Sequence, residues 1–284
     1  MAGERAVPGP PGPGSVAWRY VGDWRLLLGV GRALLLQVAH PVVGAGVSEH
    51  SDFRADPWGR FDRTLQSLMT QVYGGAGALD ESSRLRELHR PFSGLDHRGR
   101  PYRALDPEAY WWVHATIFDT VIANHARFGR PLSPGDQVRF YGEWRSLGRL
   151  LGIPASRMPD DVAGFRHYFD AMLADRLEDN PAVRDLLETL IGAGTPPPPP
   201  RWPLPTRAWQ PVAALAGRSL LWVTVGLLPP LLRHRLGLTW DRADERRLGV
   251  IAALVRTTVP AVPVRWRYHP RAAGALRAAV ASRT

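Results

Sequence analysis

The sequence predicts an all-α fold, and three observations support this expectation. Apolar residues recur at helical spacing over most of the 284 residues. Several of these segments are bounded by helix start and stop signals, with aspartate and proline at the beginning and glycine or proline at the end. The chain contains no hairpin dipeptide between alternating runs and no glycine-rich phosphate-binding motif. We also find no internal repeat.

Composition narrows the class of protein further. Apolar residues make up 45% of the chain, which is typical of a globular domain with a substantial core. The chain has no cysteine, so disulfides, zinc–thiolate sites, iron–sulfur clusters and thiol catalysis are excluded. Any metal must therefore be held by histidine, aspartate, glutamate or a cofactor.

The net charge is +10, and every one of the 36 basic residues is arginine. Such a charge favours anionic partners. The arginines are spread along the whole chain without a dense cluster, and no nucleic-acid recognition motif is present. We therefore expect no nucleic-acid partner.

Domain organisation is expected to be simple. Residues 1–15 are predicted to be a flexible arm, because they have neither an apolar core region nor a twin arginine and so do not form a secretory signal. Residues 16–284 are expected to form one helical domain. Within it, residues 194–205, GTPPPPPRWPLP, are predicted to adopt a polyproline II-like conformation, either as a linker or as a strap over one domain.

Residues 26–47 are apolar over a membrane-spanning length, but Arg32, Gln37 and His40 interrupt them. We interpret this segment as a buried core helix, and we expect the helix to end at His40, because a residue before a proline is pushed out of helical geometry. Residues 219–232 are apolar but short, and they end at Pro229-Pro230. The sequence thus predicts no integral membrane segment and a cytoplasmic location.

The next helix is predicted after Asp56, which is placed as its N-cap before Pro57, and it ends at Gly74-Gly75. Asp80 is expected to cap the following helix, which runs to His89 and is stopped by Pro91. Further helices are predicted in this order: one from Tyr110 after the turn Asp106-Pro107, one from about Pro134 to Leu151, one from Asp161 to about Arg176, one from Asp179-Asn180-Pro181 to about Gly192, and two over 215–232 and 241–258.

Arg60 and Thr64 lie four residues apart, so they share one face of the predicted helix beside its apolar stripe. Spacing alone leaves two interpretations open. The pair is either part of a solvated polar face, or it lines a pocket in which an arginine and a hydroxyl hold an anion or orient a small molecule.

Three histidines are candidates for a cofactor site. His40 and His114 lie in strongly apolar stretches, LLLQVAHPVV and WWVHATIF, where a buried histidine satisfied by a hydrogen bond is the commoner outcome. His89, in RELHRP, lies at a helix end. It is either idle in solvent or held rigid with one nitrogen free for a metal.

Other site patterns carry little weight. His50 and Asp52 match the start of a two-histidine, one-carboxylate iron site, but that motif belongs on a β-barrel, and on a helical chain we interpret it as chance. The grouping of Ser48, Glu49 and His50 does not make a convincing hydrolase triad. GxSxG, HExxH and paired carboxylate–histidine signatures are absent, which argues against serine hydrolase, zinc-protease and di-iron chemistry.

Five blocks in fixed order carry a resemblance to a known family. They read GRALLLQVAHPVVGAGVSEHSDFRADPWGRFDRTLQSLMTQVYG, LHRPFSG, GRPYRALDPEAYWWVHATIFDT, RPLSPGDQVRFYGEWRSLGRLLGIP and LLPPLLRHRLGL, and they cover roughly residues 25–240. The chain resembles the bacterial family that shares its catalytic domain with rubber oxygenase (latex clearing protein) and the fungal oxygenase MpaB. Each block is modest alone, but their order and spacing make the resemblance specific.

The resemblance implies an all-α domain that encloses haem b, with iron held by one proximal histidine. It implies O2-dependent cleavage of a carbon–carbon double bond in a polyisoprenoid or similar apolar alkene. The family's proximal histidine maps onto His89, and its haem-pocket arginine and threonine map onto Arg60 and Thr64. His40 and His114 are the reserve candidates for cofactor binding.

Two positions depart from the rubber oxygenase pattern. Arg63 stands where that enzyme has a lysine able to cap the distal iron, and a guanidinium is a poor iron ligand because it stays protonated. The carboxylate proposed as a base has no counterpart at the matching distance before Arg60, and Glu49 is the nearest. With these departures, the resemblance still implies a haem b-dependent oxygenase, and a non-catalytic haem or lipid binding protein on the same scaffold is the alternative.

Overall fold

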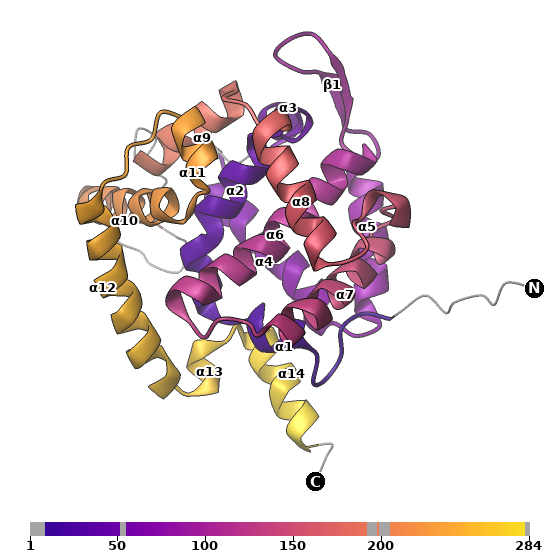
Figure 1. Cartoon of the computed structure of the whole chain (residues 1–284), viewed down its shortest axis with the longest axis vertical. Coiled ribbons are helices and arrows are strands. Elements are labelled where there is room, and N and C mark those ends of the chain that lie inside the picture. Colours follow the sequence, from indigo (N-terminus) through magenta and orange to yellow (C-terminus); the bar gives the residue numbers. More distant parts are fainter. Residues whose placement is uncertain (1–8, 52–54, 192–197, 199–204, 282–284) are drawn as a thin grey trace, which may run out of the picture.

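The computed structural model describes residues 9–51, 55–191, 198 and 205–281. Within them the fold is all-α apart from one small hairpin, as the sequence predicts (Figure 1). Residues 1–8 of the expected N-terminal arm lie outside the described residues, and Ser15 already caps the first helix. The Pro-rich segment 194–205 also lies outside them, except for Pro198 and Pro205.

The N-terminal quarter is divided into short helices rather than one core helix. They are α1 (Val16–Tyr20), η1 (Trp24–Gly29), α2 (Val30–Val38) and α3 (Pro41–His50). The axis bends by 104° at His40-Pro41, because proline cannot continue a helix and its predecessor is held in an extended conformation. The predicted end of the helix at His40 is therefore confirmed, and a second helix, α3, begins at Pro41.

Among the described residues no single helix is long and apolar enough to cross a membrane. Only the bent pair Trp24–Val38 and Pro41–His50 meets the length and composition test when its two halves are taken together.

Helix α6 (Pro107–Phe128) runs through the centre of the molecule and supplies much of the core (Figure 1). It packs against α2, against η1 and against α7 (Pro134–Leu150). Large aromatic side chains fill the interfaces between these helices and α8 (Val162–Ala171) without exposure to solvent: Trp111, Trp112, Phe118, Phe140 and Trp144. This aromatic core fixes the positions of the shorter helices around it.

Helix α4 (Pro57–Tyr73) and helix α5 (Gly77–His89) form a helical hairpin that carries the candidate residues Arg60, Thr64 and His89. Asp56 caps α4 as predicted, since its carboxylate accepts the backbone N–H of Gly59. The turn between the helices contains Gly75 in the left-handed region, with φ +55°. Asp80 lies inside the first turn of α5 rather than at its N-cap, which is Ala76, so that predicted cap was wrong.

A hairpin that the sequence analysis missed follows α5. Strands β1 (Ser93–Leu95) and β2 (Pro101–Arg103) pair antiparallel and project from the top of the molecule in Figure 1. Asp96 closes the turn by accepting the backbone N–H groups of Arg98 and Arg100. Gly99, with φ +73°, completes the reversal.

The remaining elements follow the predicted order up to residue 258, after which the sequence analysis predicted no helix. They are η2 (Ala155–Arg157), the π-helical turn η3 (Met172–Arg176), α9 (Pro181–Ile191), α10 (Thr206–Leu227), α11 (Pro230–Arg235), α12 (Arg242–Thr258), η4 (Val259–Ala261), α13 (Val264–Arg267) and α14 (Pro270–Ala281). The predicted helix over 215–232 is broken at Pro229, between α10 and α11. The C-terminal part returns to the N-terminal part, where His269 donates its backbone N–H to the carbonyl of Gly22.

Candidate functional site

His89 occupies the last position of α5 and is half-buried. Its Nδ1 lies 2.7 Å from the carbonyl oxygen of Leu85, one turn earlier on the same helix. A carbonyl only accepts hydrogen bonds, so Nδ1 carries the proton and donates, and Nε2 keeps its lone pair. The helix end therefore fixes both the tautomer and the orientation of this imidazole.

The electrostatic surroundings keep His89 neutral. Burial lowers its pKa most, and the positive charges of Arg60 and Arg84 lower it further, while the bond to the Leu85 carbonyl opposes them. A neutral imidazole with one pinned nitrogen has the form that an iron ligand requires.

Arg60 is brought near His89 by the α4–α5 hairpin. The two helices run in opposite directions, so the first turn of α4 lies beside the last turn of α5. The effect of the Arg60 charge on the His89 pKa is the electrostatic result of this proximity. These two predicted site residues, 29 positions apart in the sequence, thus share one end of the hairpin.

Thr64 lies one turn after Arg60, and both side chains are exposed. The Thr64 hydroxyl donates a 2.9 Å hydrogen bond to the carbonyl of Arg60. Arg63 points back to the helix start, where its Nη1 lies 3.0 Å from the Asp56 carboxylate. The structure therefore places Arg60 and Thr64 on one face of α4, as predicted, and directs Arg63 to the helix cap.

Aromatic rings surround His89 on two sides. The edges of Phe92 and Tyr110 meet the imidazole, each with ring centroids 5.8 Å away. His50, at the end of α3, stacks on Phe92 with centroids 4.5 Å apart and an angle of 8° between the planes. Phe92 is therefore shared by two imidazoles, one from α3 and one from α5.

His50 is the residue that sequence reasoning missed. Its Nε2 is buried and has no hydrogen-bond partner among the described residues, and the Glu49 carboxylate is 3.9 Å away. The Glu49 carboxylate in turn accepts a 2.5 Å hydrogen bond from the Tyr102 hydroxyl. The sequence signal was present in the block EHSD, but the HxD pattern suggested a metal motif and not a stacked ring. Asp52 of that motif lies outside the described residues.

His114 lies in the core between α6 and α7, one turn along α6 from Tyr110. Its Nε2 lies 2.8 Å from the Trp144 carbonyl, and Trp144 Nε1 donates to the His114 carbonyl at the same distance. The two rings stack with centroids 4.6 Å apart. Complete burial lowers the His114 pKa to about 4. This geometry is that of the structural alternative, a core histidine satisfied by hydrogen bonding.

His40 is fully buried at the N-cap of α3. Its Nε2 lies 3.5 Å from the Glu108 carboxylate, which also accepts from Arg176 at 2.8 Å. The interaction with His40, followed by that with Arg176, lowers the pKa of Glu108 to about 2. Nδ1 of His40 has no partner among the described residues. His40 therefore belongs to a polar network that joins α3, α6 and η3.

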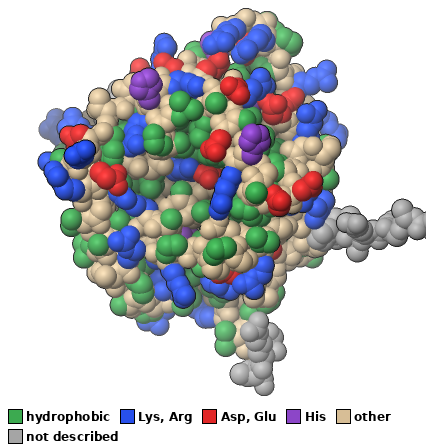
Figure 2. Space-filling model, in the orientation of Figure 1, with side chains coloured by type: hydrophobic (Ala, Val, Ile, Leu, Met, Phe, Trp, Pro, Cys, Tyr) green, Lys and Arg blue, Asp and Glu red, His purple; other side chains and the backbone are tan. Residues whose placement is uncertain are grey.

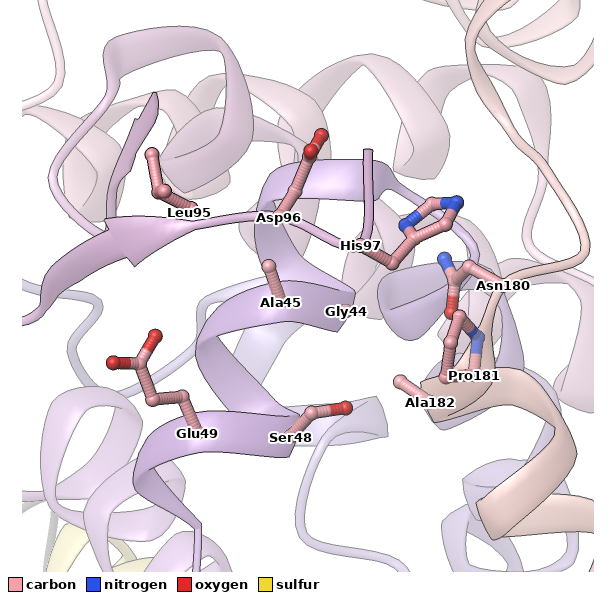
Figure 3. Close-up of a pocket in the computed structure, with 10 residues that line it drawn as sticks. All are labelled: Gly44, Ala45, Ser48, Glu49, Leu95, Asp96, His97, Asn180, Pro181 and Ala182. Atoms are coloured by element: carbon pink, nitrogen blue, oxygen red, sulfur yellow. The ribbon is translucent and has the colours of Figure 1, made fainter. Parts of the chain in front are cut away.

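A cavity of about 340 Å³ opens beside the candidate site (Figure 3). It lies between α3, the β1–β2 turn and the start of α9, and Glu49 stands at one end of it. The lining residues are Gly44, Ala45, Ser48, Glu49, Leu95, Asp96, His97, Asn180, Pro181 and Ala182. Arg60, Thr64 and His89 do not line this cavity, whereas Glu49, the neighbour of His50, does.

The donor set fits haem better than an ion held by side chains alone. The described ranges contain no group of three or more histidine, aspartate or glutamate residues able to hold a metal ion. Haem brings four ring nitrogens of its own and needs one imidazole from the protein. His89 supplies such an imidazole, and Arg60 is a cation of the kind that pairs with the propionate groups of haem.

Comparison with known proteins shows the family to which the chain belongs. The model of one family, described as "ER-bound oxygenase mpaB/B'/Rubber oxygenase, catalytic domain", matches residues 18–257. The chain belongs to this family. An oxygenase-type catalytic domain therefore spans most of the sequence, from α1 to the last turn of α12.

The similar curated proteins are themselves uncharacterised. They are Mb2261 of Mycobacterium bovis and Rv2237 of Mycobacterium tuberculosis. Each is 26% identical over 243 residues, which cover 82% of this chain and 88% of the relative. No solved structure matches the chain.

Proposed function

We propose that this protein is a haem b-dependent oxygenase that acts on an apolar, isoprenoid-like alkene, with His89 as the axial ligand of iron. The observation that carries the proposal is the hydrogen bond between His89 Nδ1 and the Leu85 carbonyl. It leaves Nε2 as the nitrogen with the free lone pair and holds the ring in one orientation. Membership in an oxygenase family supports the reaction class.

The side chains of this chain would have distinct roles. His89 would hold the iron, and the lowered pKa keeps the imidazole unprotonated and able to bind. Arg60 would pair with a carboxylate of the cofactor, since a guanidinium forms two parallel bonds with such a group. The rings of Phe92 and Tyr110 would exclude water from the ligand side. Bound haem b would supply the binding and activation of O2.

Thr64 would act as a hydroxyl donor on the same side of α4 as Arg60. In the present geometry it donates to the carbonyl of Arg60, a bond that a threonine can exchange for one to a ligand by rotating χ1. Arg63 would not coordinate iron, because its guanidinium stays protonated and is paired with Asp56.

The first experiment measures cofactor binding and turnover together. Protein purified with added haem b should show a Soret band and a stoichiometry near one haem per chain. It should then consume O2 in the presence of a soluble isoprenoid alkene. Haem binding without O2 consumption would support the alternative, a non-catalytic haem carrier. Absence of haem binding by folded protein would overturn both haem proposals.

Arg60 and Thr64 are tested with matched controls on the same helix. Arg60→Ala and Thr64→Ala should lower haem content or O2 consumption by about tenfold or more, the usual effect of losing one charged or hydrogen-bonding contact. Arg63→Ala and Thr70→Ala should retain both, since Thr70 makes the same hydroxyl-to-carbonyl bond, to Gln66, farther along α4. Full haem content and activity in both site variants would exclude Arg60 and Thr64 from the site.

A further inference from the structure

The charge of this protein is concentrated in its C-terminal part. Residues 246–284 contain eight of the 36 basic residues and none of the 26 acidic ones. The first 245 positions therefore hold 28 basic and 26 acidic residues and are almost neutral. The arginines are evenly spread along the chain, but the acidic residues are not, and this asymmetry accounts for most of the net charge of +10.

The same part of the chain exposes large apolar side chains. On α12, Val250 is 71% exposed and Leu254 is 61% exposed, and Ile251 lies between them on the same outer face. The opposite face of α12 is also apolar, but it is buried, with Leu248 and Ala252 inaccessible to solvent. A helix that needed only to pack on the domain would not require the outer apolar face.

The exposed apolar surface continues beyond α12. Val262 follows η4, and α13 carries Val264 and Trp266, of which Trp266 is 67% exposed. Tryptophan is the side chain most typical of the boundary between water and lipid, because its ring is apolar and its N–H is polar.

Arginines alternate with these apolar side chains. Arg246, Arg247, Arg256 and Arg265 are all exposed. The guanidinium of Arg265 lies 5.8 Å from the centroid of the Trp266 ring. On the face drawn in Figure 2, green apolar and blue basic side chains cover the lower left, where α12 and α13 lie in Figure 1.

We propose that α12, η4 and α13 form a docking surface for an anionic lipid bilayer, on which the apolar side chains enter the interface and the arginines contact lipid phosphates. We name this the C-terminal face, defined by Val250, Ile251, Leu254, Val262, Val264 and Trp266 with the arginines between them. Burial of apolar area together with attraction to anionic head groups is how such surfaces bind membranes. The proposal does not depend on haem binding.

Two other occupants fit these side chains less well. Nucleic acid would pair with the arginines but would leave exposed valine and leucine without a partner, since its surface is polar phosphate. A second copy in a two-fold dimer would bring two arginine-rich faces together with no acidic residue between 246 and 284 to offset them. A bilayer satisfies both the apolar and the charged side chains.

The test uses the full chain and sedimentation with lipid vesicles. Vesicles of phosphatidylcholine with phosphatidylglycerol should bind the protein about tenfold or more tightly than vesicles of phosphatidylcholine alone. Added salt should weaken this binding. Equal affinity for the two vesicle types, or no binding to either, would overturn the proposal.

Two triple variants separate the apolar and charged contributions. The apolar variant is Val250→Ser, Leu254→Ser and Trp266→Ser, and the charge variant is Arg246→Ser, Arg247→Ser and Arg265→Ser. Each should lose about tenfold or more in vesicle affinity. Circular dichroism should show that each keeps the helix content of the wild type, because all six side chains are exposed.

Matched control variants carry the same kinds of change elsewhere on the surface. Leu79→Ser with Val138→Ser removes exposed apolar side chains, and Arg90→Ser with Arg139→Ser removes exposed charges. Both control variants should bind vesicles as the wild type does. If the controls lose binding equally, or if the apolar variant binds vesicles normally, the C-terminal face is not the docking surface. Conversion of a dimer to a monomer by the apolar variant, without loss of vesicle binding, would identify an interface between copies instead.

Discussion

Two parts of the molecule each hold a histidine against aromatic rings. The two histidines differ in their hydrogen-bond partners, and this difference is why we assign a structural role to one and propose a functional role for the other. At the α6–α7 interface, His114 is enclosed by the core and exchanges hydrogen bonds with Trp144 on the facing helix. At the end of α5, His89 is half-buried and bonded only within its own helix, at Leu85. Burial lowers the pKa of both imidazoles. His114 joins two helices by hydrogen bonds, whereas His89 lies at the end of one helix.

The comparison teaches that the partner of a buried histidine indicates its role better than its burial does. The bond of His114 joins residues 30 positions apart, so losing it affects the packing of two helices. The bond of His89 joins residues four positions apart and orients the ring without holding distant elements together. We therefore expect opposite effects of substitution on stability and on ligand binding at the two sites.

The largest expected effect on folding is at His114. His114→Ala should lower the free energy of unfolding by about 2 to 3 kcal/mol, because it removes a stacked ring from the core and leaves a cavity. The exposed His167 provides the control, and His167→Ala should leave stability unchanged within about 0.5 kcal/mol. Urea unfolding of the haem-free variants measures both values. Equal stability of the two variants would remove the structural role assigned to His114.

The second expected effect is a loss of folding stability at acidic pH. The folded-state pKa of His114 is about 4, below the ordinary value of 6.5, so the unfolded chain binds a proton there at a higher pH than the folded chain. The free energy of unfolding should therefore fall as pH falls from 6.5 towards 4, and His114 should contribute no pH dependence above that window. The shifted pKa of His114 changes the free energy of unfolding across this pH window by an amount on the order of 3 kcal/mol.

The His114→Asn variant isolates this contribution, because asparagine is polar but does not titrate. Urea unfolding at several pH values should show a shallower acid slope for His114→Asn than for the wild type. The same slope in both proteins would mean that His114 does not carry the acid sensitivity.

The sequence predicted features that depend on neighbouring residues, and it missed contacts between residues that are distant in the chain. Asp56, Asp106 and Asp241 were correct as helix boundaries, since a cap depends on a few neighbouring residues. The place of His89 at a helix end followed in the same way from Pro91. In contrast, the stacking of His50 on Phe92 joins residues 42 positions apart, and no periodic pattern predicts it.

The β1–β2 hairpin was missed for a different reason. Its strands have three residues each, too few to show alternation, and its turn contains no two-residue hairpin signal. The grouping of Arg60 with His89 needed the family resemblance, because helical spacing alone left both a solvated face and a pocket lining open for Arg60. The structure supports the grouping through the electrostatic effect of Arg60 on His89.

A smaller expected effect is the influence of the Arg60 charge on the pKa of His89. Arg60→Gln should raise the pKa of His89, because it removes one of the positive charges that lower it. NMR titration of the imidazole in haem-free protein measures the shift, with His89→Ala used for assignment. Arg63→Gln is the control, since its guanidinium is paired with Asp56 and does not contribute to the lowered pKa. An unchanged His89 pKa in Arg60→Gln would show that the Arg60 charge does not act on His89.

The smallest expected effect on folding is at His89 itself. His89→Ala removes a half-buried ring and one bond within a helix, so the free energy of unfolding should fall by no more than about 1 kcal/mol. Urea unfolding of haem-free protein checks this value. A loss as large as that of His114→Ala would show that His89 also holds the core together.

The measurement that tests the central claim most directly is haem per chain, with the ferric absorbance spectrum, for His89→Ala, His114→Asn, His40→Ala and His167→Ala purified alike. The account predicts that His89→Ala alone loses haem or its Soret position while remaining folded. Normal haem content and spectrum in folded His89→Ala, with loss in the His40 or His114 variant, would contradict it and move the ligand to that histidine.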